Sequence, residues 1–411
     1  MLIAQVARRF VRSDWGGTET VVLETGRRLL AMGHRVEVHC SRALATCDRE
    51  DVEGLPVRRH AYFYPYFGLS DGARDRLDRK GGNLFSPAMM LALWRLPGLD
   101  LVHLHALKRV GGIGRTVARM RGIPYVVSVH GGVYDVPAAE AASMLEPTAG
   151  AFEWGKALGW AVGSRRVLDD ADAVLCLGPE EAARVRERHP RTRVEVLPNG
   201  VDPARFAGGD GAAFRQRHAI PAGAPVVLTV GRIDPQKDQR TAILALAALT
   251  ATHPEARLVL AGPVTDAAYR ERLAADAASA QVAGRVVFAG GLSGTDVADA
   301  YRAADAFLLP SRHEPFGIVV LEAWAAGLPV VATRVGGIPS FAEDGRDCLL
   351  VEPGDPVAAA EALRTLLRDR GRAAGLASAG RDKALGSYTW DAVTRRLAAL
   401  YEELVRQRRA R

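Results

Sequence analysis

Two carboxylates eight positions apart, Glu314 and Glu322, are the residues of this chain best suited to chemistry. The apolar run 306–310 precedes them and predicts a buried strand, and a helix is expected to begin near Phe316 or Gly317. Glu314 is therefore expected in the loop between strand and helix, and Glu322 about two turns inside the helix. In open α/β sheets, ligands bind at such loops, beyond the carboxyl ends of the strands.

The chemistry of this segment points to a ligand that carries both phosphate and hydroxyl groups. Free N–H groups of Phe316, Gly317 and Ile318 would form a helix start that binds an anion. Carboxylates repel phosphate, so Glu314 and Glu322 are better suited to accepting hydrogen bonds from hydroxyls. Sugar and ribose supply such hydroxyls, and the segment therefore indicates a site for a nucleotide that carries a sugar.

A second loop carries two cations, Arg232 and Lys237, at the end of a strand predicted near 225–231. They flank a turn at Asp234-Pro235. The guanidinium fork of an arginine and the point charge of a lysine together suit a pyrophosphate. A surface turn with solvated charges is the alternative interpretation.

The glycine pair Gly16-Gly17 follows the first predicted strand and opens the first predicted helix. Paired glycines there allow the backbone to approach a phosphate closely, although glycines are also common in ordinary turns. The dinucleotide fingerprint GxGxxG is absent from this turn, which argues against an NAD enzyme. The later glycines at 111, 112 and 114 also fail that spacing, and we expect them in a turn that starts a helix.

His130 ends a predicted strand and is followed by glycines. It can donate a hydrogen bond to a sugar hydroxyl or a phosphate, and a structural histidine is the alternative. Asn199, before Gly200, closes the first half of the chain, either as an ordinary turn or as a residue facing the ligand. His103 and His105 point the same way along one strand, but no third ligand has suitable spacing, so no metal site is expected.

Bulk composition is that of a globular protein of 411 residues, with 48% hydrophobic and 25% charged residues. This length favours two domains. We find no apolar run of transmembrane length and no signal peptide, and we expect a cytoplasmic location. The four scattered cysteines are expected to be buried free thiols: Cys40, Cys47, Cys176 and Cys348.

The net charge is +7, and residues 1–200 contribute most of it, with 28 basic and 23 acidic side chains. This excess can favour an anionic lipid surface or a phosphorylated substrate, and a solvated arginine-rich surface is the alternative. No nucleic-acid recognition motif accompanies the charge. Five rings crowd into residues 62–67, where they could pack in the core, stack on sugars or enter a membrane interface.

Strand-like and helix-like runs alternate throughout, which predicts an α/β fold of two Rossmann-like domains facing a central cleft. Helices are expected at 19–32, 112–121 and 152–168, among others. We place the domain boundary at 202–203, within the linker-like segment 202–212. Strands are predicted near 2–8, 35–41, 57–63, 99–106, 124–131, 173–178, 193–198, 225–231, 257–262, 285–290, 305–310, 329–333 and 348–351.

The order of these motifs resembles glycosyltransferase family 4, the retaining nucleotide-sugar transferases with the two-domain GT-B fold. The resemblance covers nearly the whole chain. It implies an N-terminal acceptor domain at 1–202, a nucleotide-sugar donor domain at 203–387, and a final helix within 388–411 that packs back on the first domain. The motifs that carry it are Gly16-Gly17, His130, residues 198–202, Gly231-Arg232, Lys237 and the pair Glu314 and Glu322.

The resemblance also implies roles for residues of the donor domain. Arg232 and Lys237 would hold the donor diphosphate and stabilise it as a leaving group. Glu322 would accept the ribose hydroxyls, and Glu314 would contact the hydroxyls of the donor sugar. The backbone of Phe316, Gly317 and Ile318 would bind through N–H groups, and backbone near Gly262 and Leu292 would contact the base.

From the first domain, Gly16 and Gly17 would close over the diphosphate and His130 would contact the donor sugar near the reacting carbon. Asn199 completes the expected donor-binding set. One departure from the family pattern follows His130, where many members have an acidic residue and this chain has Gly131. Contacts of that acidic side chain therefore cannot be carried over.

The reaction implied is transfer of a sugar to an acceptor on the same face of the anomeric carbon, with retention and without an obligatory metal or other cofactor. The donor would be a UDP-, GDP- or ADP-sugar. The acceptor would be a glycan or lipid-linked sugar at the inner membrane face, in polysaccharide or glycolipid synthesis. A nucleotide-sugar 2-epimerase of the same fold, or a non-catalytic nucleotide-sugar binding module, are the alternatives.

Overall fold

The computed structural model describes residues 1–79, 81–131, 134, 142 and 144–410. They form two compact units, here called unit 1 (residues 1–198 and 393–411) and unit 2 (residues 199–392). These limits lie a few residues from those expected from the sequence, and they assign Asn199 to unit 2. Among the described residues, no helix combines the length and apolarity needed to cross a membrane.

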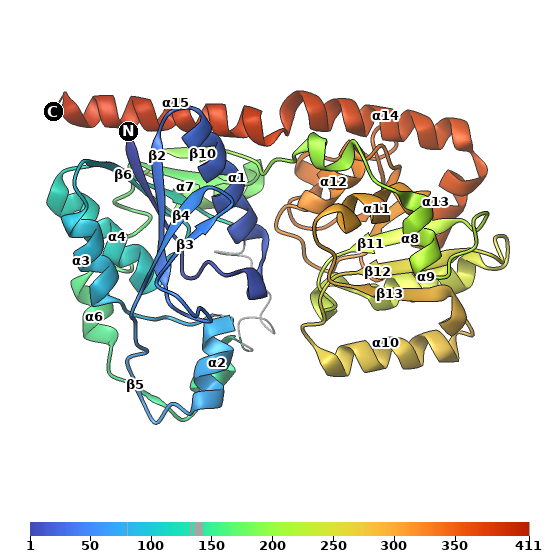
Figure 1. The fold of residues 1–411 in the computed structure, drawn as a ribbon, viewed down its shortest axis with the longest axis horizontal. Helices are drawn as coiled ribbons and strands as arrows, with labels where there is room; N and C mark the ends of the chain where they lie inside the picture. Colours follow the sequence, from blue (N-terminus) through green and yellow to red (C-terminus); the bar gives the residue numbers. More distant parts are fainter. Residues whose placement is uncertain (80, 132–133, 135–141, 143, 411) are drawn as a thin grey trace. The chain divides into compact units, whose positions relative to one another are not determined.

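Unit 1 is built on an eight-stranded sheet with the order β10-β9-β7-β6-β1-β2-β4-β3 (Figure 1). Every pairing is parallel except that of β3 with β4. The strands are β1 (Leu2–Val6), β2 (Arg35–Ser41), β3 (Arg49–Val52), β4 (Leu55–His60), β6 (Leu99–Leu104), β7 (Tyr125–Ser128), β9 (Ala173–Cys176) and β10 (Val194–Val196).

Helices cover both faces of this sheet. Apolar residues of α1 (Gly17–Ala31) and α15 (Trp390–Arg409) pack on one face, and those of α3 (Pro87–Arg95), α4 (Lys108–Arg121) and α7 (Pro179–Arg188) pack on the other. The final helix starts in unit 2, and from Val393 on it belongs to unit 1. The remaining helices are α2 (Asp71–Arg79) and α6 (Lys156–Ala161).

Two sequence predictions in unit 1 were wrong. The glycines at 111, 112 and 114 lie inside α4 rather than in a turn before it. They let α4 pack closely, because a side chain at any of them would collide with the sheet or with neighbouring segments. A Cβ on Gly114 would lie 2.3 Å from Leu104, for example. Residues 152–168 do not form one helix either. They begin with β8 (Phe152–Glu153), which pairs with β5 (Tyr66–Phe67), and α6 ends before Gly163, whose φ is +61°.

Unit 2 is built on a six-stranded parallel sheet with the order β13-β12-β11-β14-β15-β16. The predicted strands of this half agree with the observed ones to within two residues. They are β11 (Val226–Val230), β12 (Arg257–Ala261), β13 (Val286–Gly290), β14 (Ala306–Leu309), β15 (Val330–Thr333) and β16 (Leu349–Val351). The strand order reverses between β11 and β14, the point where open α/β sheets bind ligands.

Apolar residues of α9 (Gln239–Leu249), α10 (Ala267–Ser279) and α13 (Pro356–Arg368) pack on one face of this sheet. On the other face, Tyr301 of α11 (Thr295–Ala303) stacks on Phe307 of β14. The other helices are α8 (Gly211–Arg217), α12 (Ile318–Ala325) and α14 (Arg370–Ser387). Alternating parallel strands and helices in both halves confirm the predicted α/β fold class.

Candidate functional site

The loops after β11 and β14 bring together a lysine and a glutamate that are far apart in the sequence. The Nζ of Lys237 lies 2.5 Å from Oε2 of Glu314, and the hydroxyl of Ser311 donates to the same oxygen at 3.2 Å. Glu314 is only 7% exposed. A carboxylate at this depth is stabilised by its pairing with the cation, so the two charges act as one neutral group.

Arg232 lies in the same loop as Lys237 and keeps most of its donors available. Its guanidinium is half-buried and, among the described residues, donates only to Gln236, with Nη2 3.5 Å from Oε1. Its carbonyl accepts a hydrogen bond of 2.7 Å from the side chain of Gln239, which fixes the backbone of the loop. In the part of the chain that the structure describes, Arg232 forms no ion pair, so its fork can bind an anion.

Gly262 follows β12 and lets the loop after β11 pack closely against the end of β12. Gly262 has a φ of +149°, and a Cβ on it would lie 2.0 Å from the carbonyl oxygen of Gly231. The N–H of Gly262 donates to Gly290 at the end of β13. Leu292 follows in the next loop and is half-buried. The predicted base-contact residues thus lie beyond the carboxyl ends of adjacent strands.

The helix start predicted after Glu314 is present, although it lies slightly later than expected. Gly317 has a φ of +96° and precedes the first residue of α12, Ile318. Within the described residues, no hydrogen bond from the N–H of Phe316, Gly317 or Ile318 is found. These donors can therefore receive an anion or a hydroxyl oxygen.

Glu322 is the fifth residue of α12, so it lies about one turn inside the helix and not two. The expectation was wrong because the left-handed backbone at Gly317 delays the helix. Oε2 of Glu322 accepts a hydrogen bond of 2.8 Å from the hydroxyl of Tyr301, which is almost fully buried. No pattern in the sequence connects Tyr301 with this carboxylate.

The glycine pair Gly336-Gly337 supports the loop that carries Glu314, and our sequence reasoning missed it. Gly336 has a φ of +52°, and a Cβ on it would lie 2.1 Å from the carbonyl oxygen of Glu314. The N–H of Gly337 donates to that same oxygen at 3.0 Å. A glycine pair soon after a predicted strand was the available signal, as it was for Gly16-Gly17.

In unit 1, Gly16 precedes the first residue of α1, Gly17. The N–H of Gly16 donates to the carboxylate of Glu19 at 3.0 Å, and burial raises the pKa of Glu19 above its ordinary value. Among the described residues, a Cβ on Gly17 would meet no atom within 4 Å. Packing therefore does not require glycine at position 17, and the space beside this helix start is open.

His130 follows β7 and is partly buried. Its Nε2 lies 2.9 Å from Nδ1 of His105, and desolvation lowers the pKa of His130 to about 4. The imidazole is therefore neutral near pH 7. Asn199 is 7% exposed and precedes a short pairing of Val201 with Tyr388 and Trp390.

The predicted site residues of unit 2 lie in the segments that follow β11, β12, β13 and β14, apart from Asn199, which lies at the start of this unit. Gly16, Gly17 and His130 follow strands of the unit 1 sheet. Over the described ranges, no three histidine, cysteine or acidic side chains are placed to hold a metal ion. Cys40, Cys176 and Cys348 are buried free thiols, whereas Cys47 is exposed.

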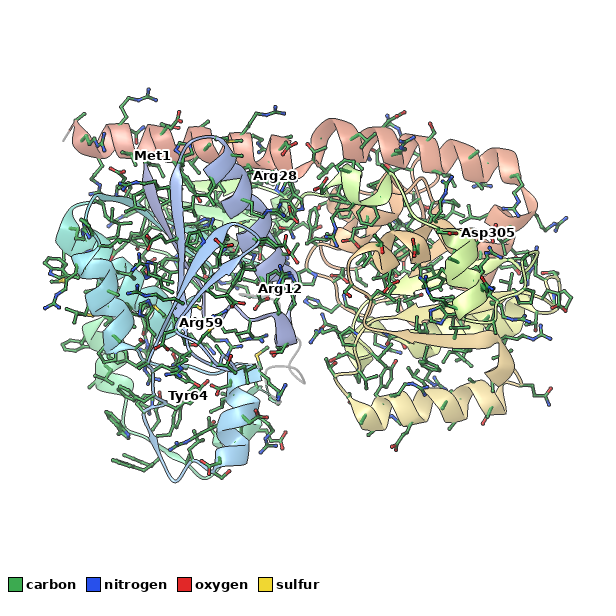
Figure 2. The ribbon with its side chains drawn as sticks, in the orientation of Figure 1. Met1, Arg12, Arg28, Arg59, Tyr64 and Asp305 are labelled. Carbon is green, nitrogen blue, oxygen red and sulfur yellow. The ribbon has the colours of Figure 1, made fainter. Side chains whose placement is uncertain are left out.

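The aromatic residues at 62–67 divide between core and surface. Tyr62 and Tyr64 pack against the core and donate to the two oxygens of Asp78 at 2.7 and 2.8 Å (Tyr64 is labelled in Figure 2). Phe63 and Phe67 are exposed instead. Together with Phe152 and Trp154 they form a group of stacked, exposed rings, here called the aromatic ribbon.

Comparison with known proteins matches both halves of the chain to glycosyltransferase domains. Residues 16–200 match the "Glycosyl transferase 4-like domain", and residues 210–383 match "Glycosyl transferases group 1". The chain is 33% identical to D-inositol 3-phosphate glycosyltransferase of Salinispora tropica, over 97% of this chain and 83% of that protein. It is 32% identical to D-inositol 3-phosphate glycosyltransferase 2 of Catenulispora acidiphila, over 97% and 92%.

Solved structures give the same result. Sucrose-phosphate synthase from Thermosynechococcus elongatus is 25% identical with a TM-score of 0.76, over 98% of both chains. HepE of Anabaena, solved with UDP and glucose, shares the fold at 18% identity with a TM-score of 0.72, over 97% of this chain and 99% of that one. This chain therefore belongs to glycosyltransferase family 4, the retaining nucleotide-sugar transferases with the GT-B fold.

Proposed function

We propose that the loops after β11 and β14 bind the diphosphate and the sugar of the donor, and that this site drives a retaining transfer. The observation that carries the proposal is the pair formed by Lys237 and Glu314 at the switch point of unit 2. Next to it lie the guanidinium of Arg232 and the helix start after Gly317. Cationic, acidic and N–H groups suit the diphosphate, the sugar hydroxyls and the developing negative charge, respectively.

The pairing explains how a carboxylate can serve beside a diphosphate. An isolated Glu314 would repel the donor, whereas a Glu314 neutralised by Lys237 does not. When the diphosphate approaches Lys237, Oε1 of Glu314 is still able to accept a hydrogen bond from a sugar hydroxyl. Arg232 adds a fork of donors that matches the phosphate oxygens.

The chemical step then depends on positioning and on charge stabilisation. The acceptor hydroxyl forms a bond to the anomeric carbon on the face from which the diphosphate leaves, and its proton passes to the leaving phosphate oxygen. Arg232, Lys237 and the N–H groups at 316–318 stabilise the negative charge that develops there. No cofactor is needed for this step, because the donor is already activated by its diphosphate.

The proposal also includes the contacts with the ribose, the base and the donor sugar. We propose that Glu322 accepts the ribose hydroxyls, that backbone at Gly262 and Leu292 contacts the base, and that Asn199 lines the donor site. Gly16 and Gly17 would approach the diphosphate, and His130 would contact the sugar. Backbone groups would select the base, so the residue types here do not tell uridine from guanosine or adenosine, and the donor can be a UDP-, GDP- or ADP-sugar.

Thermal stability with UDP, GDP and ADP, each with and without its sugar, tests the donor site. A ligand at 100 times its Kd stabilises the folded protein by about 2.7 kcal/mol, which is readily measured. We expect one nucleotide to raise the Tm, and Lys237→Ala to abolish that rise. A rise that survives both Lys237→Ala and Arg232→Ala would contradict the assigned site.

For the acceptor, we propose a glycan or lipid-linked sugar in polysaccharide or glycolipid synthesis, at the cytoplasmic face of an anionic membrane. The support is the aromatic ribbon, with Phe67 63% and Phe152 68% exposed, and Trp160 nearby in the sequence at 87%. Exposed tryptophan and phenylalanine side chains favour membrane interfaces and sugar rings. The basic excess of the first half adds attraction to anionic lipids.

Two assays separate the acceptor classes. The first offers inositol 3-phosphate, the acceptor named for the relatives, alongside lipid-linked sugars, and measures transfer to each. The second measures sedimentation of the protein with vesicles of phosphatidylcholine and phosphatidylserine at physiological salt. We expect the protein to bind these vesicles, and the double variant Phe67→Ser/Phe152→Ser to bind them less. Transfer to inositol 3-phosphate alone, with no vesicle binding, would overturn this acceptor assignment.

A further inference from the structure

Three histidines lie together where β6 and β7 end. His103 uses both ring nitrogens, with Nε2 2.8 Å from the hydroxyl of Ser128 and Nδ1 2.5 Å from the hydroxyl of Tyr401 in α15. The ring of His105 lies against that of His103, with centroids 4.0 Å apart. His103 is thereby fixed on two sides, and it restricts the rotation of its neighbour.

The imidazole of His105 has only one hydrogen-bond partner in the described chain. Its Nδ1 lies 2.9 Å from Nε2 of His130, and the two rings are only 18° from parallel, which suits a hydrogen bond in the ring plane. Its Nε2 is buried and finds no partner among the described residues. The link to His130 is therefore the one interaction that can set the proton of His105.

All three rings are neutral near pH 7. Burial lowers the pKa of His103 to about 3 and that of His105 well below its ordinary value, and desolvation lowers the pKa of His130 to about 4. A neutral imidazole has one N–H and one bare nitrogen. Nδ1 of His105 and Nε2 of His130 are 2.9 Å apart, so only one of them carries a proton, because two facing N–H groups would clash.

The two possible arrangements leave different groups buried at Nε2 of His105. If His130 were the donor, His105 would bury an N–H without an acceptor. If His105 is the donor, it buries only a bare nitrogen. Buried N–H groups without partners are the rarer defect, while unsatisfied acceptors are better tolerated.

We infer that His105 is a positioning residue whose Nδ1–H donates to Nε2 of His130 and thereby holds the proton of His130 on Nδ1. His130 then offers a hydrogen-bond donor, not a base, to the bound sugar nucleotide. This inference rests on the proposed contact of His130 with the donor sugar. A donor at fixed orientation can strengthen its bond as charge develops on the substrate, without reorganisation.

The tautomer can be read directly in the full-length protein without substrate. We would record nitrogen-15 spectra of labelled imidazoles and assign the His130 signals by their loss in His130→Gln. A protonated Nδ1 and a bare Nε2 on His130 are expected. The reverse pattern would overturn the inference while leaving the donor site untouched.

Variants at position 105 then connect the tautomer to transfer. His105→Asn retains an N–H near the position of Nδ1 and should keep kcat/KM within about threefold of wild type, a change below about 1 kcal/mol. His105→Asp can only accept, so it should move the proton of His130 to Nε2 and lower kcat/KM about 10- to 100-fold. The affinity for the free nucleotide should change in neither.

His39→Asp is the matched control, because His39 is a buried histidine of the same sheet that contacts His60 and not the proposed site. It should lower the Tm without moving the proton of His130. Equal losses of kcat/KM in His105→Asp and His39→Asp would mean that destabilisation explains both, and would overturn the inference. Wild-type transfer by His130→Ala would refute the sugar contact as well, whereas Lys237→Ala tests the diphosphate site separately.

Discussion

The two units hold their polar site groups by opposite means. Unit 2 keeps charges and neutralises them in pairs, as with Lys237 and Glu314. Unit 1 keeps histidines neutral by burying them, as with His103 and His105. The difference teaches that unit 2 would offer full charges to a ligand, whereas unit 1 would offer oriented dipoles. Changes in pH and in charge should therefore affect the two units differently.

Lowering the pH should have the largest effect, because it should destabilise unit 1 more than unit 2. The folded pKa values of His103 and His130 lie below the unfolded value of about 6.5, so their stabilisation is complete above pH 6.5 and is lost as the pH falls toward 4. Each should contribute about 2 kcal/mol less at pH 5 than at pH 7. Hydrogen exchange, corrected for intrinsic rates, should show unit 1 opening first. Equal losses in both units would contradict this, because the buried histidines among the described residues belong to unit 1.

Removing the cation of unit 2 should have an effect nearly as large. Lys237→Ala leaves Glu314 buried without its cation and removes the proposed contact with the diphosphate, so kcat/KM should fall about 1,000-fold, or about 4 kcal/mol. Steady-state kinetics with the donor identified by thermal shift would measure it. Arg240→Ala, which removes a surface ion pair with Asp276, should leave kcat/KM unchanged.

Substitutions of two glycines in unit 2 test whether its backbone conformation requires glycine. Gly262→Ala must relieve a 2.0 Å approach to Gly231 at a φ of +149°, so we expect a loss of about 2 to 3 kcal/mol in the free energy of unfolding of unit 2. Denaturant unfolding would measure this loss. Gly284→Ala, with open space around it and no left-handed φ, is the control and should change stability little.

Gly17→Ala in unit 1 should lower activity and leave stability unchanged, and this effect should be smaller than that of Gly262→Ala. A Cβ there meets no described atom within 4 Å, so the stability of unit 1 should be unchanged. If the donor diphosphate approaches this backbone, the extra methyl group should lower kcat/KM about tenfold, or about 1.4 kcal/mol. A variant with unchanged kcat/KM would remove Gly16-Gly17 from the site.

Much of the fold could be read from the sequence because buried parallel strands are short apolar runs between helices. The strands of unit 2 were placed to within two residues for this reason. The glycines of α4 and residues 152–168 were misassigned, because only the neighbouring chain decides whether a glycine breaks a helix or lets it pack closely. The small strands β3, β5 and β8 were missed, since their pairing depends on distant partners.

The loops of the candidate site could be placed from local spacing, as for Arg232, Lys237 and the two glutamates, whose binding roles stay predictions. Their pairing could not be predicted, because Lys237 and Glu314 are 77 residues apart and only the sheet brings them together. The same holds for Tyr301 with Glu322 and for Gly336 beneath the Glu314 carbonyl. The histidine link in unit 1 was also hidden, since the sequence showed His103 and His105 only as neighbours on one strand.

The final helix has a consequence for how the protein is made. Leu397, Tyr401 and Leu404 of α15 cover apolar residues of the unit 1 sheet, yet they are translated after all of unit 2. Unit 1 is therefore the first to leave the ribosome and the last to be completed. Until the last helix arrives, the part of one sheet face that α1 does not cover is an exposed apolar surface of the kind that chaperones recognise. A nascent chain stalled within unit 2 would therefore carry two unfinished folding units.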